Sequence, residues 1–207
     1  MSFIKISVDN FSIFKKSALC YNRKIKISMK THRFYIKDMG LEKDIIVNKK
    51  ACPELYNQVV NVLRLQKAEH VKLFRESLDY VYEIKDITHD ELTLILKDKI
   101  ENRVDAALKS KSQVNLYIAN IKKDKIEWCV EKATELGVAS INLISTERAQ
   151  KLNTQINSNK NNLNRLEKII IEATEQCGRG ELVKINESQK LEKAIQSIAE
   201  SGRENIN

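Results

Sequence analysis

The sequence predicts a small β-barrel over residues 31–100, followed by an incomplete α/β half-domain with parallel strands over residues 113–200. Apolar residues tend to alternate before Val114 and recur at helical spacing after it, and these are the periods of a strand and a helix. Residues 101–112 are charged and have little apolar periodicity, so we expect them to connect the two parts. Two later helical patterns end in glycine, as helix C-termini commonly do.

Composition places the chain among globular proteins, because 42% of its 207 residues are hydrophobic and 31% are charged. Its net charge of +8 favours a polyanionic partner. Most of this charge lies in residues 1–30, which hold seven cations and one acid, so it is weak evidence that the folded body binds nucleic acid. We interpret residues 1–28 as an extension or an upstream start. A basic arm that grips RNA is the alternative.

The four cysteines form no Cys-x-x-Cys pair and the three histidines are scattered, which argues against a metal site or a disulfide framework. Free thiols of this kind are typical of a reducing compartment. No apolar run approaches the roughly 20 residues of a membrane span, and residues 1–30 lack the centre of a secretory signal. The sequence therefore predicts a soluble cytoplasmic protein.

In the first part, short runs rich in β-branched and aromatic residues predict strands, and a helical stretch interrupts them. The expected strands are residues 34–36, 45–47, 71–74, 80–84 and 92–96, and the helical stretch is 53–65. Several short strands with polar turns indicate a small barrel.

The second part begins with a βαβ pattern. A strand over residues 114–119 is followed by a helix whose apolar stripe runs from Ile126 to Leu136, with Asp124 as its expected N-cap and Gly137 at its end. A second strand over residues 141–144 should run parallel to the first.

Three further segments complete this part. A helix with its apolar stripe between Leu163 and Ala173 should end at Gly178, and the Asn-rich residues 153–164 before it predict a solvated loop. Residues 194–199 predict a last helix.

Several short segments carry a family resemblance. They are Arg33-Phe34-Tyr35, Val62-Leu63-Arg64, Lys-Ala-Thr-Glu-Leu-Gly-Val at 132–138, Ser-Thr-Glu-Arg at 145–148 and Glu-Ala-Thr-Glu-Gln-Cys-Gly-Arg at 172–179. In this combination the chain resembles the bacterial methyltransferases that modify N3 of a uridine in small-subunit ribosomal RNA. These enzymes belong to the trefoil-knotted SPOUT class.

The resemblance implies residues 31–102 as a PUA-like β-barrel that binds RNA and residues 113–207 as the N-terminal part of a SPOUT domain. It implies S-adenosylmethionine as methyl donor, small-subunit ribosomal RNA as substrate and a homodimer. The family's donor pocket lies in a Gly-Pro-Glu-Gly-Gly loop and a Leu-Gly-x-Arg-Ile-Leu-Arg segment, which these 207 residues do not contain. We therefore expect a C-terminally truncated chain without the knot, inactive on its own.

The barrel departs from the family pattern at two turns. Ala68 stands where a glycine is expected, and Arg75-Glu76-Ser77 replaces an Asp-Gly turn. Because glycine reaches left-handed backbone angles without steric cost, these replacements put the turn geometry in doubt.

The resemblance makes Glu175 and Arg179 the candidate catalytic residues. Glu175 could take the N3 proton and Arg179 could stabilise negative charge on a uracil oxygen. An ordinary ion pair four residues apart near a helix end is the alternative. Arg33, Arg64 and Arg148 are the candidate RNA contacts, and for the first two a solvated cation is an equal alternative.

Other enzyme classes fit less well. With five glycines and neither a G-x-G-x-x-G motif nor a P-loop, the chain does not match Rossmann-type methyltransferases, dehydrogenases or NTPases. Two non-catalytic alternatives stay open: an RNA-binding remnant, and a gene-decay fragment that does not fold stably.

Overall fold

The computed structural model describes residues 31–102, 104, 113–119, 121–147 and 160–204. The helices and strands of the described residues lie in one compact unit, His32–Asn207. The predictions for residues 1–28 and for Arg148, and most of the expected connection at 101–112, fall outside the described residues. The elements follow the order β1 (His32–Tyr35), β2 (Ile45–Asn48), α2 (Pro53–Asn57), η2 (Gln58–Val62), β3 (His70–Arg75), β4 (Leu78–Ile87), β5 (Glu91–Glu101), β6 (Asn115–Ala119), α4 (Lys123–Leu136), β7 (Ser140–Ser145), α6 (Lys160–Cys177), β8 (Lys184–Lys190) and α7 (Leu191–Glu204).

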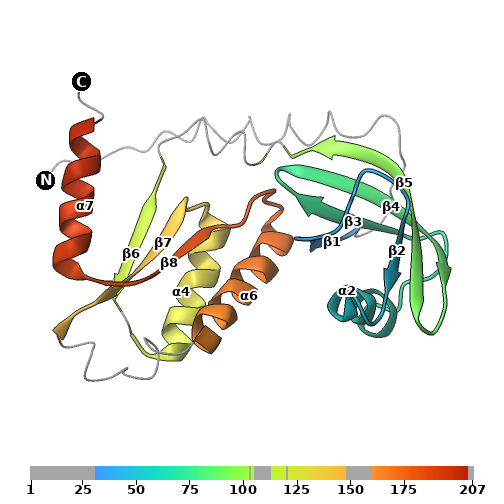
Figure 1. The fold of residues 1–207 in the computed structure, drawn as a ribbon, viewed down its shortest axis with the longest axis horizontal. Coiled ribbons are helices and arrows are strands. Elements are labelled where there is room, and N and C mark those ends of the chain that lie inside the picture. The colour runs from blue at the N-terminus through green and yellow to red at the C-terminus, as the bar shows by residue number, and fades with distance from the viewer. Residues whose placement is uncertain (1–30, 103, 105–112, 120, 148–159, 205–207) are drawn as a thin grey trace, which may run out of the picture. The chain divides into compact units, whose positions relative to one another are not determined.

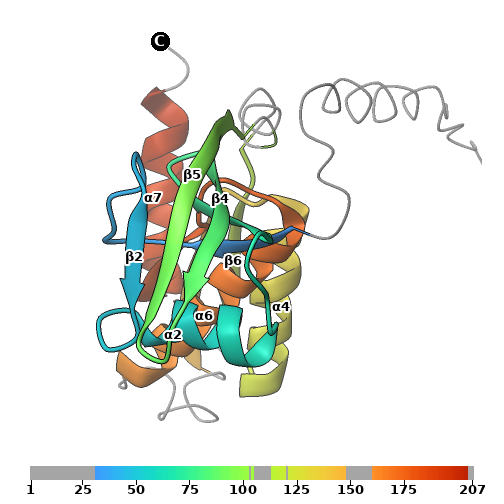
Figure 2. The ribbon, with the colours of Figure 1, turned by 90° about the vertical axis from the view of Figure 1, so that its right-hand side faces the viewer.

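Five strands form the first sheet, in the order β1-β3-β4-β5-β2. β1 runs parallel to β3, and the other neighbours are antiparallel. The pairing of β4 with β5 contains two register shifts, which increase local twist and bend, and Figure 2 shows the curl of β4 and β5. All five predicted strands are confirmed. Within the described residues β1 and β2 are the two edges, so the hydrogen-bonded strands form an open, curled sheet.

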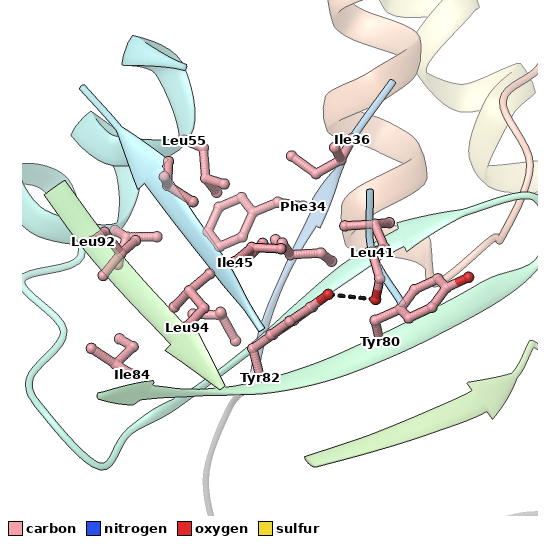
Figure 3. Packing of buried hydrophobic residues seen from close by; sticks show 14 of the residues in the cluster. Phe34, Ile36, Leu41, Ile45, Leu55, Tyr80, Tyr82, Ile84, Leu92 and Leu94 are labelled. Carbon is pink, nitrogen blue, oxygen red and sulfur yellow. Dashed lines mark hydrogen bonds between the residues drawn. The ribbon is translucent and has the colours of Figure 1, made fainter. Parts of the chain in front are cut away.

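The core of this sheet comes from alternating strand residues and from the helical segment α2 and η2, in the predicted stretch. Leu55 and Val59 of that segment are buried together with strand residues such as Val47 and Leu94. The hydroxyl of Tyr82 donates to the carbonyl of Leu41 at 2.5 Å, so the buried ring keeps its polar atom bonded (Figure 3). Burial raises the pKa of Tyr82 to about 12.

The two turns without glycine keep left-handed geometry. Ala68 has φ of 69°, and Glu76 and Ser77 have 52° and 61°. Glu76 and Ser77 form a two-residue hairpin loop between the paired residues Arg75 and Leu78, where positive φ at both positions matches the twist of the strands. The turn geometry is therefore retained at a steric cost of about 1–2 kcal/mol per residue.

Three parallel strands, in the order β6-β7-β8, form the second sheet. The predicted parallel pairing of the first two is confirmed. Helices α4 and α6 pack against one face of this sheet, as Figure 1 shows, and bury a cluster that includes Val130, Ile141 and Ile170. β8 was not predicted, because its sequence is polar and mostly half-exposed or exposed. One side-chain bond supports its pairing: the amide of Asn186 donates to Asn142 Oδ1 at 2.7 Å.

Three predicted boundaries were wrong. α4 is preceded by Lys122 rather than capped by Asp124, which lies in its first turn where its charge suits the helix dipole. α6 begins at Lys160, so residues 160–164 continue its helix instead of belonging to the Asn-rich loop. β5 extends to Glu101, so the charged connection starts after that residue. The predicted glycine ends are confirmed: Gly137 and Gly178 have φ of 90° and 80°. The last helix, α7, contains the predicted residues 194–199.

Among the described helices, none combines the length and the apolar character that crossing a membrane would require.

Candidate functional site

Helices α4 and α6 end in the same way. Each carries Ala-Thr-Glu in its last turns, and Ala133, Thr134, Ala173 and Thr174 are all buried. The two helices pack against each other, and small residues allow their backbones to approach closely. A glycine with left-handed backbone angles ends each helix, and its N–H donates to the carbonyl of the threonine, at 3.2 Å in both cases. The repeated sequence therefore encodes two similar helix ends with carbonyls that need donors.

Arg179 supplies donors to the end of α4. Its side chain is buried, and Nη1 donates to the carbonyls of Thr134 at 3.2 Å and Val138 at 3.0 Å. The N–H groups of Gly137 and Val138 close a Schellman turn there. A guanidinium at this position satisfies helix-end carbonyls and complements the negative end of the helix dipole.

Arg33 supplies donors to the end of α6. Its side chain is 9% exposed and pairs with the Asp79 carboxylate at 2.7 Å, with its guanidinium carbon 3.4 Å from the centre of the Phe74 ring. Nη1 donates to the carbonyls of Thr174 at 3.3 Å and Arg179 at 2.5 Å. Arg33 thus links strands β1 and β4 to the C-terminus of α6.

Glu175 lies in the last turn of α6 and faces β1. Its Oε1 accepts the backbone N–H of Tyr35 at 2.8 Å. Burial raises the pKa of Glu175 to about 7, and the charge of Glu172 contributes, while the Tyr35 N–H and the charge of Arg33 oppose the rise. The group can therefore gain or lose a proton near neutral pH.

Two polar residues of the first part of the chain, Ser77 and Asn102, extend the same region. Ser77 in the strained β3–β4 turn donates through its N–H to Gly180 O at 3.3 Å and through its hydroxyl to Glu181 at 2.9 Å. The side-chain amide of Asn102 donates to the carbonyl of Gly178 at 2.9 Å. We call this region the α6 junction; its members are Arg33, Ser77, Asp79, Asn102, Thr174, Glu175, Arg179 and Glu181.

The structure brings three of the five candidate residues together, because Arg33, Glu175 and Arg179 all belong to the α6 junction. Glu175 and Arg179 face different elements, β1 and the end of α4. Arg64 is exposed after η2 with φ of 53°, and its carbonyl accepts a bond from Gln66. Arg148 lies outside the described residues. No catalytic or RNA-binding role is tested by these positions, but the burial of Arg33 favours a structural role over contact with phosphate.

Sequence reasoning missed Ser77, Asp79 and Asn102. For Asp79 a signal existed: it is an acid within the otherwise apolar and aromatic start of β4, Leu78-Asp79-Tyr80-Val81-Tyr82. A charge in such a setting requires a buried partner. Ser77 and Asn102 carry no comparable signal.

Comparison with known proteins finds a family similar to the second part of the chain. Residues 108–206 match the RNA methyltransferase domain family. The match covers the three-stranded sheet, α4, α6 and the α6 end of the junction.

Named relatives cover both parts. The chain is 31% identical over 152 residues to the ribosomal RNA small subunit methyltransferase E of Rickettsia conorii, covering 73% of this chain and 57% of that protein. It is 29% identical over 136 residues to methyltransferase E 2 of Borreliella burgdorferi, covering 64% and 53%. The chain thus spans little more than half the length of these curated relatives.

Solved structures share the fold. A putative methyltransferase from Legionella pneumophila in complex with S-adenosylmethionine superposes with a TM-score of 0.62 at 21% identity, covering 81% of this chain and 66% of that one. The small subunit methyltransferase E of Neisseria gonorrhoeae, also bound to S-adenosylmethionine, gives 0.56 at 19%, covering 80% and 64%. The arrangement of a curled sheet beside a parallel α/β sheet is therefore that of these methyltransferases.

Proposed function

We propose that the whole protein is an S-adenosylmethionine-dependent methyltransferase that acts on N3 of a uridine in small-subunit ribosomal RNA, in the cytoplasm. The observation that carries this proposal is the match of residues 108–206 to the RNA methyltransferase domain. Relatives named as ribosomal RNA small subunit methyltransferases support the substrate class. In this proposal residues 31–102 are a PUA-like RNA-binding module and residues 113–207 belong to a SPOUT-type domain that acts as a homodimer.

Methylation at N3 requires an unpaired base and the loss of the imino proton as the methyl group arrives. We assign the proton acceptor to Glu175, since a general base works best with a pKa near the working pH. Its pKa of about 7 and its half-buried position at the α6 junction support this assignment. The hydrogen bond from the Tyr35 N–H fixes one carboxylate oxygen.

The arginines divide into two groups in this proposal. Exposed Arg64, and Arg148 at the Ser-Thr-Glu-Arg segment, are the proposed phosphate contacts, which would fix the RNA on the protein. The side chains of Arg33 and Arg179 are largely buried and bond to helix-end carbonyls, so we assign them to positioning. Arg179 then supports Glu175 through the backbone at the end of α6.

Structures of similar proteins bound to S-adenosylmethionine support this methyl donor, whereas no pocket found among the described residues does. A hollow of about 470 Å³ at the start of α4 is lined by Lys123, Asp124, Glu127 and Arg165. This charged lining does not fit the adenine and methionine groups, which need apolar walls with a few convergent polar atoms.

The test is methyl transfer from labelled S-adenosylmethionine to small ribosomal subunits or their RNA, followed by digestion to nucleosides and mass spectrometry. Label in 3-methyluridine supports the proposal, and label only in another nucleoside contradicts the N3 assignment. Binding of the RNA without transfer agrees both with the expected inactivity of a chain without the donor loops and with the non-catalytic RNA-binding alternative.

A pair of variants tests the proton acceptor. Glu175→Gln should retain RNA affinity and lose most transfer, because glutamine keeps the acceptor for Tyr35 but cannot take a proton. Glu172→Gln removes an exposed charge one turn away and should retain transfer. Equal loss in both variants would contradict the role of Glu175.

A further inference from the structure

Two arginines at the α6 junction make similar contacts, because each donates to a threonine carbonyl at the end of a helix. Arg33 donates to Thr174 O at the end of α6, and Arg179 donates to Thr134 O at the end of α4. The two sites are connected, because Arg33 also donates to the carbonyl of Arg179 itself at 2.5 Å. The backbone that Arg33 holds is therefore the backbone from which the Arg179 side chain extends.

We infer that Arg33 and Arg179 form a two-step joint that couples the curled sheet, through the end of α6, to the end of α4. In the first step the Asp79–Arg33 pair fixes the carbonyl of Arg179. In the second, the fixed residue places its guanidinium between the carbonyls of Thr134 and Val138. A movement of the sheet would thus reach a helix that Arg33 itself does not bond.

The burial of the joint supports this assignment. The side chains of Arg33 and Asp79 are 9% and 11% exposed, so their charges lie in a medium where electrostatic bonds are strong. The Arg33 guanidinium also stacks on Phe74, which fixes its plane. An RNA phosphate could use this group only after these bonds break.

The experiment is amide hydrogen exchange, followed residue by residue on the full chain. The test variant combines Arg33→Met with Asp79→Leu, because removing both charges leaves neither one buried without a partner. The reporters are the N–H of Gly178, at the end of α6, and the N–H groups of Gly137 and Val138, at the end of α4. A joint predicts that exchange at all three becomes roughly ten- to a hundredfold faster, while Val81 in β4 keeps its wild-type rate.

A matched control combines Lys67→Met with Asp86→Leu at an exposed ion pair, and should leave all these rates unchanged. Arg179→Met should accelerate Gly137 and Val138. If the double variant does not fold, Arg33→Lys retains the charge opposite Asp79 but lacks the planar fork, and should give the same pattern with a smaller effect. Faster exchange at Gly178 alone would make Arg33 a local cap and overturn the joint. Equal acceleration at every amide, Val81 included, would also overturn it.

Discussion

Replacement of Glu175 by glutamine should remove a specific pH dependence of stability. In the folded protein burial raises the pKa of Glu175 to about 7 from its ordinary 4.5. Between these two values the folded state holds a proton that the unfolded state has lost. The contribution to stability is therefore complete below pH 4.5 and is lost as the pH rises through 7.

The magnitude follows from the size of this rise. Each pKa unit is worth about 1.4 kcal/mol, so the rise corresponds to at most about 3 kcal/mol, and solvent screening of a half-buried group reduces this to about 1–2 kcal/mol. Glutamine stays neutral and still accepts the Tyr35 N–H. Glu175→Gln should therefore match the wild type near pH 4.5 and exceed its stability by about 1–2 kcal/mol at pH 8.

Urea unfolding at a series of pH values measures this difference, and fluorescence of the single tryptophan, Trp128 on α4, provides the signal. Glu172→Gln is the comparison: it removes an exposed charge that contributes less than burial to the raised pKa of Glu175, so it should reduce the pH dependence only in part. A difference between Glu175→Gln and the wild type that is constant from pH 4.5 to pH 8 would refute the reasoning. So would a loss of stability at pH 8.

Four further outcomes are expected in urea unfolding. Ala68→Gly should stabilise the chain by about 0.5–1 kcal/mol, because relief of left-handed strain exceeds the added freedom of the unfolded chain, and lower stability would contradict this. Ser77→Gly should change stability little, because the relief of backbone strain is offset by loss of the 2.9 Å hydrogen bond from the Ser77 hydroxyl to Glu181. A gain equal to that of Ala68→Gly would show that this hydrogen bond contributes no stability. Ala173→Leu should cost about 1–3 kcal/mol or more by overpacking the contact between α4 and α6, and no loss would mean the helix ends are loosely packed. Asn186→Ala should cost about 1–2 kcal/mol, because it leaves Oδ1 of buried Asn142 without this donor, and an unchanged midpoint would count against the pairing of β8 through side chains.

The sequence predicted most elements because their apolar periods are clear. Alternation in the first part and helical spacing in the second both correspond to faces that are buried in the structure. β8 was missed because its sequence holds a single apolar residue, Ile185, and so shows no alternating pattern. Its place is fixed by pairing with β7 and by the Asn186–Asn142 bond. The N-cap of α4 was misplaced because Asp124 suits two positions, the cap and the first turn, and sequence alone does not separate them.

The position of residues 172–179 at a helix end was predictable, but the geometry of their side chains was not. The residues at 172–179 do lie at a helix end that meets the sheet. The directions in which their side chains point depend on contacts between residues more than 100 positions apart, such as Arg33 and Arg179. Local sequence patterns carry no information about these contacts. The β3–β4 turn at Glu76 and Ser77 is an example. Ser77 tolerates an unfavourable φ of 61°, and its hydroxyl reaches Glu181, a contact that glycine cannot make.

The geometry of the junction narrows the chemistry that its residues can perform. Arg179 donates from Nη1 to the carbonyls of Thr134 and Val138, so turning its buried guanidinium towards a uracil oxygen would break both bonds, which is costly. Glu175 carries no such constraint, because its bond to the Tyr35 N–H uses one oxygen and persists in glutamine. Its pKa of about 7 also lets it exchange a proton without rearrangement. If this region takes part in methyl transfer, Glu175 is therefore the residue that handles the proton, and the arginines hold it in place.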